Sequence, residues 1–339
     1  MLAALAGGAA GYGALRVFGR GRAADLRGRV VLITGGSRGL GLQLARDLAR
    51  HGCKIAICAR DPAELDSARD AIARSGARVW SRVCDVTDRH QVEALVRNAI
   101  DHYGRLDILI ANAGVIQVGP IEHMRLEDFE EAMNVMFWGV LYPIWSALPH
   151  MLQQRSARIV TIASIGGKIS VPHLIPYSCA KFAAVALSEG LHAELAPKGI
   201  KVHTIIPGLM RTGSYLNAFF KGRQADEFRW FGLSSSLPAI TMSAERASAQ
   251  IIETIRTGRP ERVLTTPAQL LARFHGAFPE LSQAILKLVN RVVLPTGEGG
   301  SADKVSGREA EGRLGPLFST LTALGKAAAA RGNERPAGA

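Results

Sequence analysis

The sequence contains few cysteines. Cys53, Cys58, Cys84 and Cys179 are the only four in 339 residues, and they form no CxxC pair and no metal-ligand spacing with a histidine. This pattern argues against a disulfide scaffold and predicts no metal site. It favours reduced, mostly buried thiols and therefore a cytoplasmic location.

The sequence also lacks, at its start, an apolar run as long as a membrane span. Residues 1–15 carry no charge but are mainly Ala and Gly, and as a helix they would span roughly 22 Å, against a hydrocarbon core of about 30 Å. No positive charge precedes them, which argues against a secretory signal peptide. The arginines that follow would hold the main domain in the cytoplasm if the segment inserts. Two interpretations stay open: membrane association through residues 1–20, or an N-terminal arm or docked helix.

Acidic residues are fewer than basic ones, 29 against 41, so the net charge is +12. Such a balance suits a nucleic acid, an anionic lipid or a phosphorylated cofactor, and it also fits an Arg-rich surface without any partner. No nucleic-acid recognition motif accompanies the charge, so we expect no nucleic-acid partner. Apolar residues make up 47% and charged residues 21%, which excludes a wholly disordered, collagen-like or coiled-coil chain.

From residue 29 the sequence alternates short apolar runs with helical stretches. The apolar runs predict strands at 30–33, 54–59, 77–83, 106–111, 158–163 and 201–206. The stretches between them predict helices at 40–50, 62–75, 88–103, 126–154 and 177–195. The strands are apolar throughout, as in a sheet covered on both faces. We therefore expect an α/β fold: a Rossmann-type doubly wound parallel sheet in a three-layer α/β/α arrangement.

The predicted domain organisation has four parts. Residues 1–27 form an apolar segment and basic linker, and residues 28–266 form the Rossmann-type catalytic domain. Within that domain, an aromatic-rich connection at 209–237 precedes a helix and a last edge strand. Residues 267–295 form a helical extension, and residues 296–339, rich in Gly, Ala and charge, are expected to be a mobile tail apart from a short helix near 317–330.

A glycine-rich turn follows the first predicted strand. It reads Thr34-Gly35-Gly36-Ser37-Arg38-Gly39-Leu40-Gly41. Glycines let the backbone turn sharply and approach a pyrophosphate, while the next helix directs its first N–H groups at that charge. Any tight strand-to-helix turn favours glycine, but the position after the first strand of an alternating α/β chain favours a dinucleotide cofactor.

The second predicted strand ends at Ala59 and is followed by Arg60. A NAD site usually has an acidic residue at this tip, which accepts from the ribose 2′-hydroxyl. A guanidinium suits a 2′-phosphate instead, and Arg38 lies in the glycine-rich turn nearby. We expect NADP(H) to be favoured over NAD(H). The alternative is that Asp61 is the acid and Arg60 a solvated helix-start residue.

Tyr177 and Lys181 stand four residues apart on a predicted helix, so their side chains share one face. An ammonium beside a phenol favours the phenolate and lowers its pKa from about 10. Tyr177 is thus a candidate general acid or base for a carbonyl/alcohol pair. Ser164, at the end of a predicted strand, is placed to hydrogen-bond the carbonyl oxygen.

These motifs together resemble the short-chain dehydrogenase/reductase family, in its one-domain branch, over about residues 28–255. The resemblance rests on order and spacing: Thr34-Gly35-x-x-x-Gly39-x-Gly41, Asp85-Val86, Asn112-Ala113-Gly114, Asn134, Ser164, Tyr177-x-x-x-Lys181, Pro207-Gly208 and Thr212. The chain extends beyond the family core at both ends and lacks the glycine-rich closing strand of many tetrameric members.

The resemblance implies a role for each of these residues. Tyr177 would exchange the proton and contact the cofactor, Lys181 would hold the nicotinamide ribose and tune Tyr177, and Ser164 would orient the substrate oxygen. Asn134 would support a water-linked proton path, and Thr212 would contact the nicotinamide carboxamide. The remaining cofactor contacts would be Thr34, Gly35, Ser37, Arg38, Gly39, Leu40, Gly41, Arg60, Asp85, Val86, Asn112, Ala113, Gly114, Pro207 and Gly208.

The sequence therefore predicts an NADP(H)-dependent oxidoreductase acting on the CH–OH or C=O group of a small apolar ketone, aldehyde or alcohol. The layout of the two ends is similar to that of membrane-associated members acting on steroids, retinoids or other lipids, so contact with a membrane surface is expected as one possibility. The resemblance also implies a homo-oligomer, a dimer or tetramer, through the helices at 126–154 and 177–195. The alternative is a non-catalytic NADPH-binding regulator or scaffold of the same fold.

Overall fold

The computed structural model describes residues 23–238, 240–312 and 322–334. Predictions that concern residues 1–20, including membrane association through them, lie outside the described residues.

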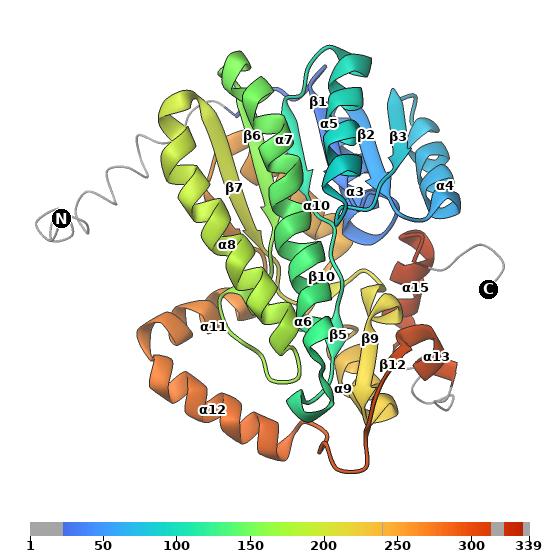
Figure 1. Cartoon of the computed structure of the whole chain (residues 1–339), viewed down its shortest axis with the longest axis vertical. Helices are drawn as coiled ribbons and strands as arrows, with labels where there is room; N and C mark the ends of the chain where they lie inside the picture. Colours follow the sequence, from blue (N-terminus) through green and yellow to red (C-terminus); the bar gives the residue numbers. More distant parts are fainter. Residues whose placement is uncertain (1–22, 239, 313–321, 335–339) are drawn as a thin grey trace, which may run out of the picture.

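The core of the molecule is a sheet of seven parallel strands in the order β11-β7-β6-β4-β1-β2-β3 (Figure 1). The strands are β1 (Val30–Thr34), β2 (Lys54–Ala59), β3 (Val79–Val83), β4 (Ile108–Ala111), β6 (Ala157–Ile162), β7 (Ile200–Ile206) and β11 (Glu261–Val263). From β1 the chain adds β2 and β3 on one side and then β4, β6, β7 and β11 on the other. An open α/β sheet forms its ligand crevice at this change of direction, between β1 and β4. The predicted doubly wound parallel sheet is confirmed.

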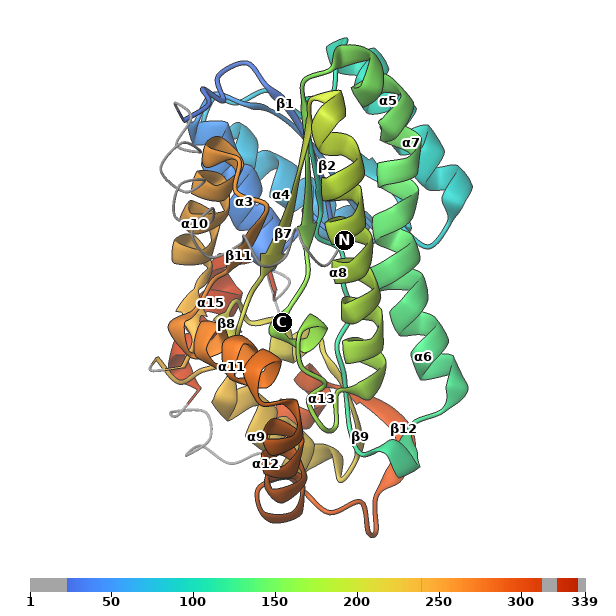
Figure 2. The ribbon, with the colours of Figure 1, turned by 90° about the vertical axis from the view of Figure 1, so that its left-hand side faces the viewer.

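Helices cover both faces of this sheet, as the edge-on view in Figure 2 shows. One face carries α3 (Gly39–Arg50), α4 (Pro62–Ala73) and α10 (Ala244–Thr257), and the other carries α5 (Arg89–Tyr103), α7 (Gly139–Gln154) and α8 (Ile175–Leu195). Alternate residues of each strand enter different cores: Val31 and Ile33 pack with α3, whereas Val30 and Leu32 pack with α5. Because both faces are covered, the central strands β1 and β4 are fully buried and almost wholly apolar. The edge strands β3 and β11 differ from the expectation, since they are partly exposed and carry charged residues.

The long helical stretch Leu126–Gln154 consists of α6 (Leu126–Met133), a π-helical turn at Asn134–Trp138, and α7. Among the described residues it alone is long and apolar enough to span a membrane, and 44% of its most apolar window is buried. Val140, Ile144 and Ala147 belong to the main core. The stretch is therefore a partly buried core helix of the fold.

A second, smaller sheet lies beyond the carboxyl ends of the main strands (Figure 1). It joins β5 (Gln117–Val118), β9 (Phe219–Gly222) and β12 (Ser301–Ser306) in the order β12-β9-β5. With α9 (Gln224–Ser234) it encloses an aromatic core that includes Phe220, Phe228 and Phe231. A pair of two-residue strands, β8 (Met210–Arg211) and β10 (Met242–Ser243), completes the connection after Pro207.

The C-terminal part begins with α11 (Thr266–Ala277) and α12 (Pro279–Val292), close to the helical extension that the sequence predicts. After it the structure differs from the expected mobile tail, because β12 pairs with β9 and is followed by α13 (Gly307–Gly312) and α15 (Ala323–Arg331). Ala310 and Ala329 are buried against the aromatic core around Phe220. The small side chains that suggested mobility allow this close packing.

Candidate active site

A cavity of about 850 Å³ opens at the carboxyl ends of β1, β2, β4 and β6. Seventeen of the eighteen predicted cofactor residues and all but one of the predicted catalytic residues line it. The predicted residues in its wall are Gly35, Ser37, Arg38, Gly39, Leu40, Gly41, Arg60, Asp85, Val86, Asn112, Ala113, Gly114, Ser164, Tyr177, Lys181, Pro207, Gly208 and Thr212. Thr34 and Asn134 do not line it.

The glycine-rich turn packs too closely for side chains at two of its positions. A Cβ on Gly41 would lie 2.1 Å from the carbonyl oxygen of Gly35, and Gly35 itself has φ +63°. These contacts set α3 directly on the end of β1, so that its first turn faces the cavity. The turn therefore has the cradle shape that a dinucleotide pyrophosphate requires.

Thr34 contributes to the site from behind the cavity wall. Its hydroxyl accepts from the backbone N–H groups of Asn112 (3.0 Å) and Ala113 (3.2 Å). The Asn112 amide in turn donates to the carbonyl oxygens of Thr34 and Gly35. These bonds tie the turn after β1 to the turn after β4, so both residues fix the shape of the cofactor cavity.

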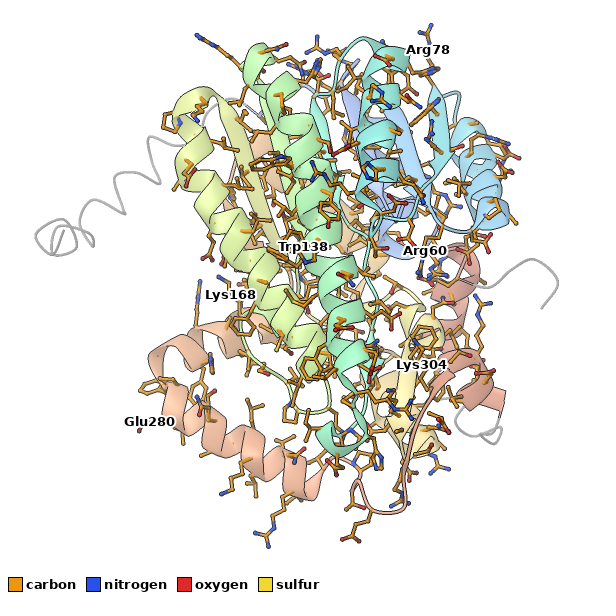
Figure 3. All side chains as sticks on the ribbon, in the orientation of Figure 1. Arg60, Arg78, Trp138, Lys168, Glu280 and Lys304 are labelled. Carbon is orange, nitrogen blue, oxygen red and sulfur yellow. The ribbon has the colours of Figure 1, made fainter. Side chains whose placement is uncertain are left out.

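The tip of β2 has the two features on which cofactor preference depends. Arg60 is exposed and lines the cavity (Figure 3). The Asp61 carboxylate accepts from the backbone N–H of Glu64 at 2.8 Å and so caps α4. Arg38 is paired with Glu64, at 3.1 Å between Nη1 and Oε1. The acid beside the tip is thus engaged in a helix cap.

Ser164, Tyr177 and Lys181 meet at the inner end of the cavity. Ser164 follows β6, and its hydroxyl accepts from the backbone N–H of Gly166 at 3.1 Å. Tyr177 and Lys181 project from the same face of α8, and the Lys181 Nζ lies 5.8 Å from the centre of the Tyr177 ring. Lys181 Nζ also donates to the carbonyl oxygen of Ile162 at 2.8 Å. The three groups needed for carbonyl chemistry therefore share one wall.

Burial has the largest effect on the pKa values of Lys181 and Tyr177. It lowers the pKa of Lys181 from 10.5 to about 8. Burial raises the pKa of Tyr177, and the hydrogen bond between Tyr177 and Ser164 opposes this increase only in part. The direction for Tyr177 differs from the sequence-based expectation, because removal from water outweighs the hydrogen bond with Ser164. In the cofactor-free protein Tyr177 is therefore a phenol, ready to donate a proton.

Asn134 lies in the π-helical turn between α6 and α7, where its side chain is exposed. Val135, the next residue, lines the cavity instead. The role of Asn134 in a proton path stays a prediction.

Several residues of the cavity wall had no assigned role in the sequence motifs. Val171, Leu174, Trp230, Phe231 and Leu271 form an apolar part of the wall, and the aromatics of 209–237 were the signal for it. Glu334 also lines the cavity, and no motif pointed to that residue. Across the described residues, no cluster of His, Cys, Asp and Glu is suited to a metal ion.

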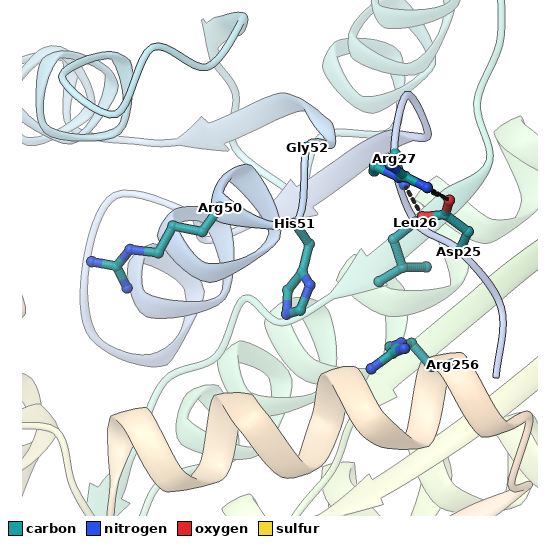
Figure 4. Close-up of a pocket in the computed structure, with 7 residues that line it drawn as sticks. All are labelled: Asp25, Leu26, Arg27, Arg50, His51, Gly52 and Arg256. Carbon is teal, nitrogen blue, oxygen red and sulfur yellow. Dashed lines mark hydrogen bonds and ion pairs between the residues drawn. The ribbon is translucent and has the colours of Figure 1, made fainter.

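A second hollow lies at the opposite, amino end of β1 and β2 (Figure 4). It has a volume of about 380 Å³ and is lined by Asp25, Leu26, Arg27, Arg50, His51, Gly52 and Arg256. The Arg27 guanidinium is paired with Asp25 at 2.8 Å. None of the catalytic or cofactor candidates reaches it, so the larger cavity is the candidate active site.

Known proteins with the same features belong to one family. The short chain dehydrogenase family matches residues 29–219. Glycine betaine reductase ATRR from Emericella nidulans is 33% identical over 228 residues, which are 67% of this chain and 17% of that longer protein. Oxidoreductase BOA17 from Botryotinia fuckeliana is 31% identical over 228 residues, 67% of this chain and 77% of that protein.

Solved structures agree. A short-chain dehydrogenase/reductase from Burkholderia phymatum, in complex with NAD, has a TM-score of 0.68 at 25% identity and covers 76% of this chain and 96% of its own. The chain belongs to the short-chain dehydrogenase/reductase family of oxidoreductases.

Proposed function

We propose that this protein is an NADP(H)-dependent oxidoreductase that interconverts an apolar ketone or aldehyde and its alcohol. The observation that carries the proposal is that Ser164, Tyr177 and Lys181 line the same cavity as the glycine-rich turn. The complete set argues against the alternative of a non-catalytic, NADPH-binding regulator.

The chemistry divides between cofactor and protein. When bound, the nicotinamide supplies or accepts the hydride. Tyr177, whose raised pKa keeps its phenol protonated at neutral pH, then donates that proton to the carbonyl oxygen. The Ser164 hydroxyl hydrogen-bonds the same oxygen and holds it in place, and the Lys181 ammonium favours the tyrosinate that remains. Alcohol oxidation uses the same groups in reverse.

The preference for NADP(H) rests on the tip of β2. Arg60 lines the cavity, and Asp61 is engaged in capping α4. A guanidinium forms paired, charge-assisted bonds with a 2′-phosphate. The Burkholderia phymatum relative is in complex with NAD, so the comparison with NADH is part of the test.

The apolar substrate is inferred from the rest of the cavity wall. Val171 and Leu174 precede α8, while Trp230 and Phe231 come from α9 and Leu271 from α11. Such a wall binds hydrophobic carbonyl compounds better than sugars or acids, because apolar contact replaces water at both surfaces.

Exposed apolar side chains on two surfaces support binding of further partners by the enzyme. Trp138 and Trp145 on the long helix, and Phe182 on α8, are exposed, which supports a homo-oligomer through these helices. On α12, Leu281, Ile285, Leu288 and Val292 are exposed at helical spacing, a pattern that suits contact with a membrane surface.

The test is NADPH oxidation, with NADH in parallel, against steroid, retinal, long-chain and small aromatic carbonyls. We expect turnover with a KM for NADPH at least tenfold below that for NADH. Tyr177→Phe should lower kcat by about 10²–10⁴-fold, because the proton donor is lost while the ring remains.

Tyr103→Phe is the matched control. Its hydroxyl donates to the carbonyl oxygen of Ile55, near the amino end of β2, at 3.0 Å, and Tyr103 does not line the cavity. This variant should keep its kcat. Binding of neither cofactor would contradict the proposal, and equal turnover by wild type and Tyr177→Phe would contradict the role of Tyr177.

A further inference from the structure

The last described residues of the chain lie directly on the glycine-rich turn. The carbonyl oxygen of Gly332 accepts from the backbone N–H of Gly39 at 2.8 Å. The Asn333 amide donates to the carbonyl oxygens of Ser37 (3.0 Å) and Glu64 (3.1 Å). Figure 1 shows α15, which leads into this segment, next to α4 at the carboxyl end of the sheet. The segment Gly332–Glu334 thus covers the start of α3.

Glu334 places its carboxylate inside the cavity. The side chain is 4% exposed, and its Oε2 lies 3.6 Å from the Arg38 Nε. Asn217 donates a hydrogen bond to the same oxygen. The Oε1 atom lies 2.5 Å from the place where a Cβ on Gly39 would stand. The carboxylate therefore fills the space that the absent side chain of Gly39 leaves open.

That space is the part of the cavity which a dinucleotide pyrophosphate needs. Because glycines have no side chain, an anion can approach the backbone of the turn, and the first N–H groups of α3 favour negative charge there. Here the Gly39 N–H already has an acceptor, and a carboxylate already lies beside Arg38. A pyrophosphate cannot enter while the Glu334 carboxyl group fills this space, because two groups cannot occupy the same position.

We infer that the segment Gly332–Glu334 is an intramolecular competitor of the cofactor, which a dinucleotide must displace from the glycine-rich turn before it binds. The inference rests on the proposed function, because it assumes that the cavity holds a dinucleotide. It adds that the C-terminal segment of this chain lowers the affinity of the chain for its own cofactor.

The segment is held in a way that permits release. Its direct bonds to the turn are polar contacts that water or a cofactor can replace. The helix before it packs through small residues, with Ala329 against Gly213 and Gly325 against Tyr215. Gly332, Asn333 and Glu334 carry no large apolar side chain, so releasing these three residues exposes little apolar surface.

The ionisation of Glu334 makes the contact depend on pH. Burial raises the pKa of Glu334 from 4.5 to about 7, with Glu64 acting in the same direction, while Arg38 and Arg308 oppose it. The docked carboxyl holds its proton to a higher pH than the released one. Docking is therefore strongest at low pH and weakens as the pH rises through about 7.

The experiment compares the dissociation constants of NADPH and NADH, by calorimetric titration, for the full chain and two variants. One variant ends at Arg331, and the other is Glu334→Ala. We expect both variants to bind both cofactors at least tenfold more tightly at pH 6, with a smaller gain at pH 8. Glu280→Ala, which removes an acid from α12 on the far side of the molecule from Arg60 (Figure 3), should bind like wild type.

Hydrogen exchange supplies a readout that does not depend on turnover. Adding NADPH to the full chain should speed amide exchange in α15, although bound ligands ordinarily slow exchange. A merely structural contact would predict unchanged or slower exchange.

The outcomes separate this inference from the proposed function. Equal dissociation constants in all variants, or weaker binding after truncation, would overturn the inference and leave the proposed function standing. Slower exchange in α15 on adding NADPH would overturn it as well. Failure of every variant to bind either cofactor would overturn both.

Discussion

Lys181 carries its charge in a buried position of the cavity wall. Its side chain donates to the carbonyl oxygen of Ile162, and removal from water lowers its pKa from 10.5 to about 8. Such a shift corresponds to about 3 kcal/mol of unfavourable free energy for the charged form in the folded state. A site that needs this ammonium for chemistry therefore reduces the stability of the fold that holds it.

We predict that Lys181→Met loses turnover but gains stability. Below pH 8 both folded and unfolded wild type carry the proton, so the folded state bears the full cost. Between pH 8 and 10.5 the folded state loses the proton first and the cost disappears. After about 1–2 kcal/mol for the unpaired Ile162 carbonyl, the variant should be about 1–2 kcal/mol more stable at pH 7, and this gain should vanish by pH 10.

The measurement is urea unfolding of the cofactor-free protein at both pH values. Lys168→Met is the control, because Lys168 is paired with Glu189 (2.6 Å) and Glu261 (2.9 Å), and these carboxylates raise its pKa. It should bring no gain. A Lys181→Met protein less stable than wild type at pH 7 would contradict the argument.

Among the elements, β9 depends on a buried ion pair that joins it to α6. Lys221 Nζ lies 2.5 Å from a carboxylate oxygen of Asp128, and both residues are 4% exposed. The same oxygen accepts from the backbone N–H of Arg125 and so caps α6. The pair fixes the small sheet against the long helix and thereby positions the aromatic side of the cavity.

We predict that Lys221→Met destabilises the protein by about 3–5 kcal/mol, because it leaves Asp128 charged and unpaired inside the protein. The double variant Lys221→Met with Asp128→Asn should recover most of this loss, since Asn keeps the capping oxygen without the charge. Urea unfolding at pH 7 measures both. If the double variant were no more stable than the single one, the buried charge would not be the cause.

The small sheet also shows where sequence patterns stop being informative. The inner strands of the main sheet were predictable, because most of their residues form local apolar runs bounded by turn residues. The strands β5, β9 and β12 come from residues near 117, 220 and 303, and two-residue or polar strands carry no local period. Their pairing is decided by contacts between segments far apart in the chain.

The same distinction holds in the site. Tyr177 and Lys181 were predictable because their spacing on one helix decides that they face together. Thr34 was expected in the cofactor cavity, but its hydroxyl ties Asn112 and Ala113 from behind the wall. Glu334 was not predictable, because a single acid in a segment rich in Gly and Ala shows nothing of the fold that brings it back to Gly39.

At the scale of the whole molecule, the face formed by α7 and α8 presents large apolar side chains to water. The two helices lie side by side on one face (Figure 1). Trp145 is 66% exposed, and Trp138 and Phe182 are about two-fifths exposed. Trp138 stacks on Tyr142 one turn before Trp145, so the aromatic rings follow one side of α7. Exposed aromatic groups of this kind mark protein–protein contacts.

We predict that the protein sediments as a dimer or tetramer, and that Trp145→Glu shifts it to a smaller species. In a two-fold interface each substitution occurs twice, which places carboxylates in a water-excluded contact. Since an unpaired buried charge costs about 3–5 kcal/mol, the dissociation constant should rise at least a hundredfold.

Leu288→Glu is the matched control for this experiment. Leu288 is 60% exposed on α12, on a different surface, so its substitution should leave the oligomer intact. Both variants keep the core residues of the sheet, and their unfolding free energies as monomers should remain similar. A monomeric wild type would contradict the assignment, and dissociation by Leu288→Glu alone would move the interface from α7 and α8 to α12.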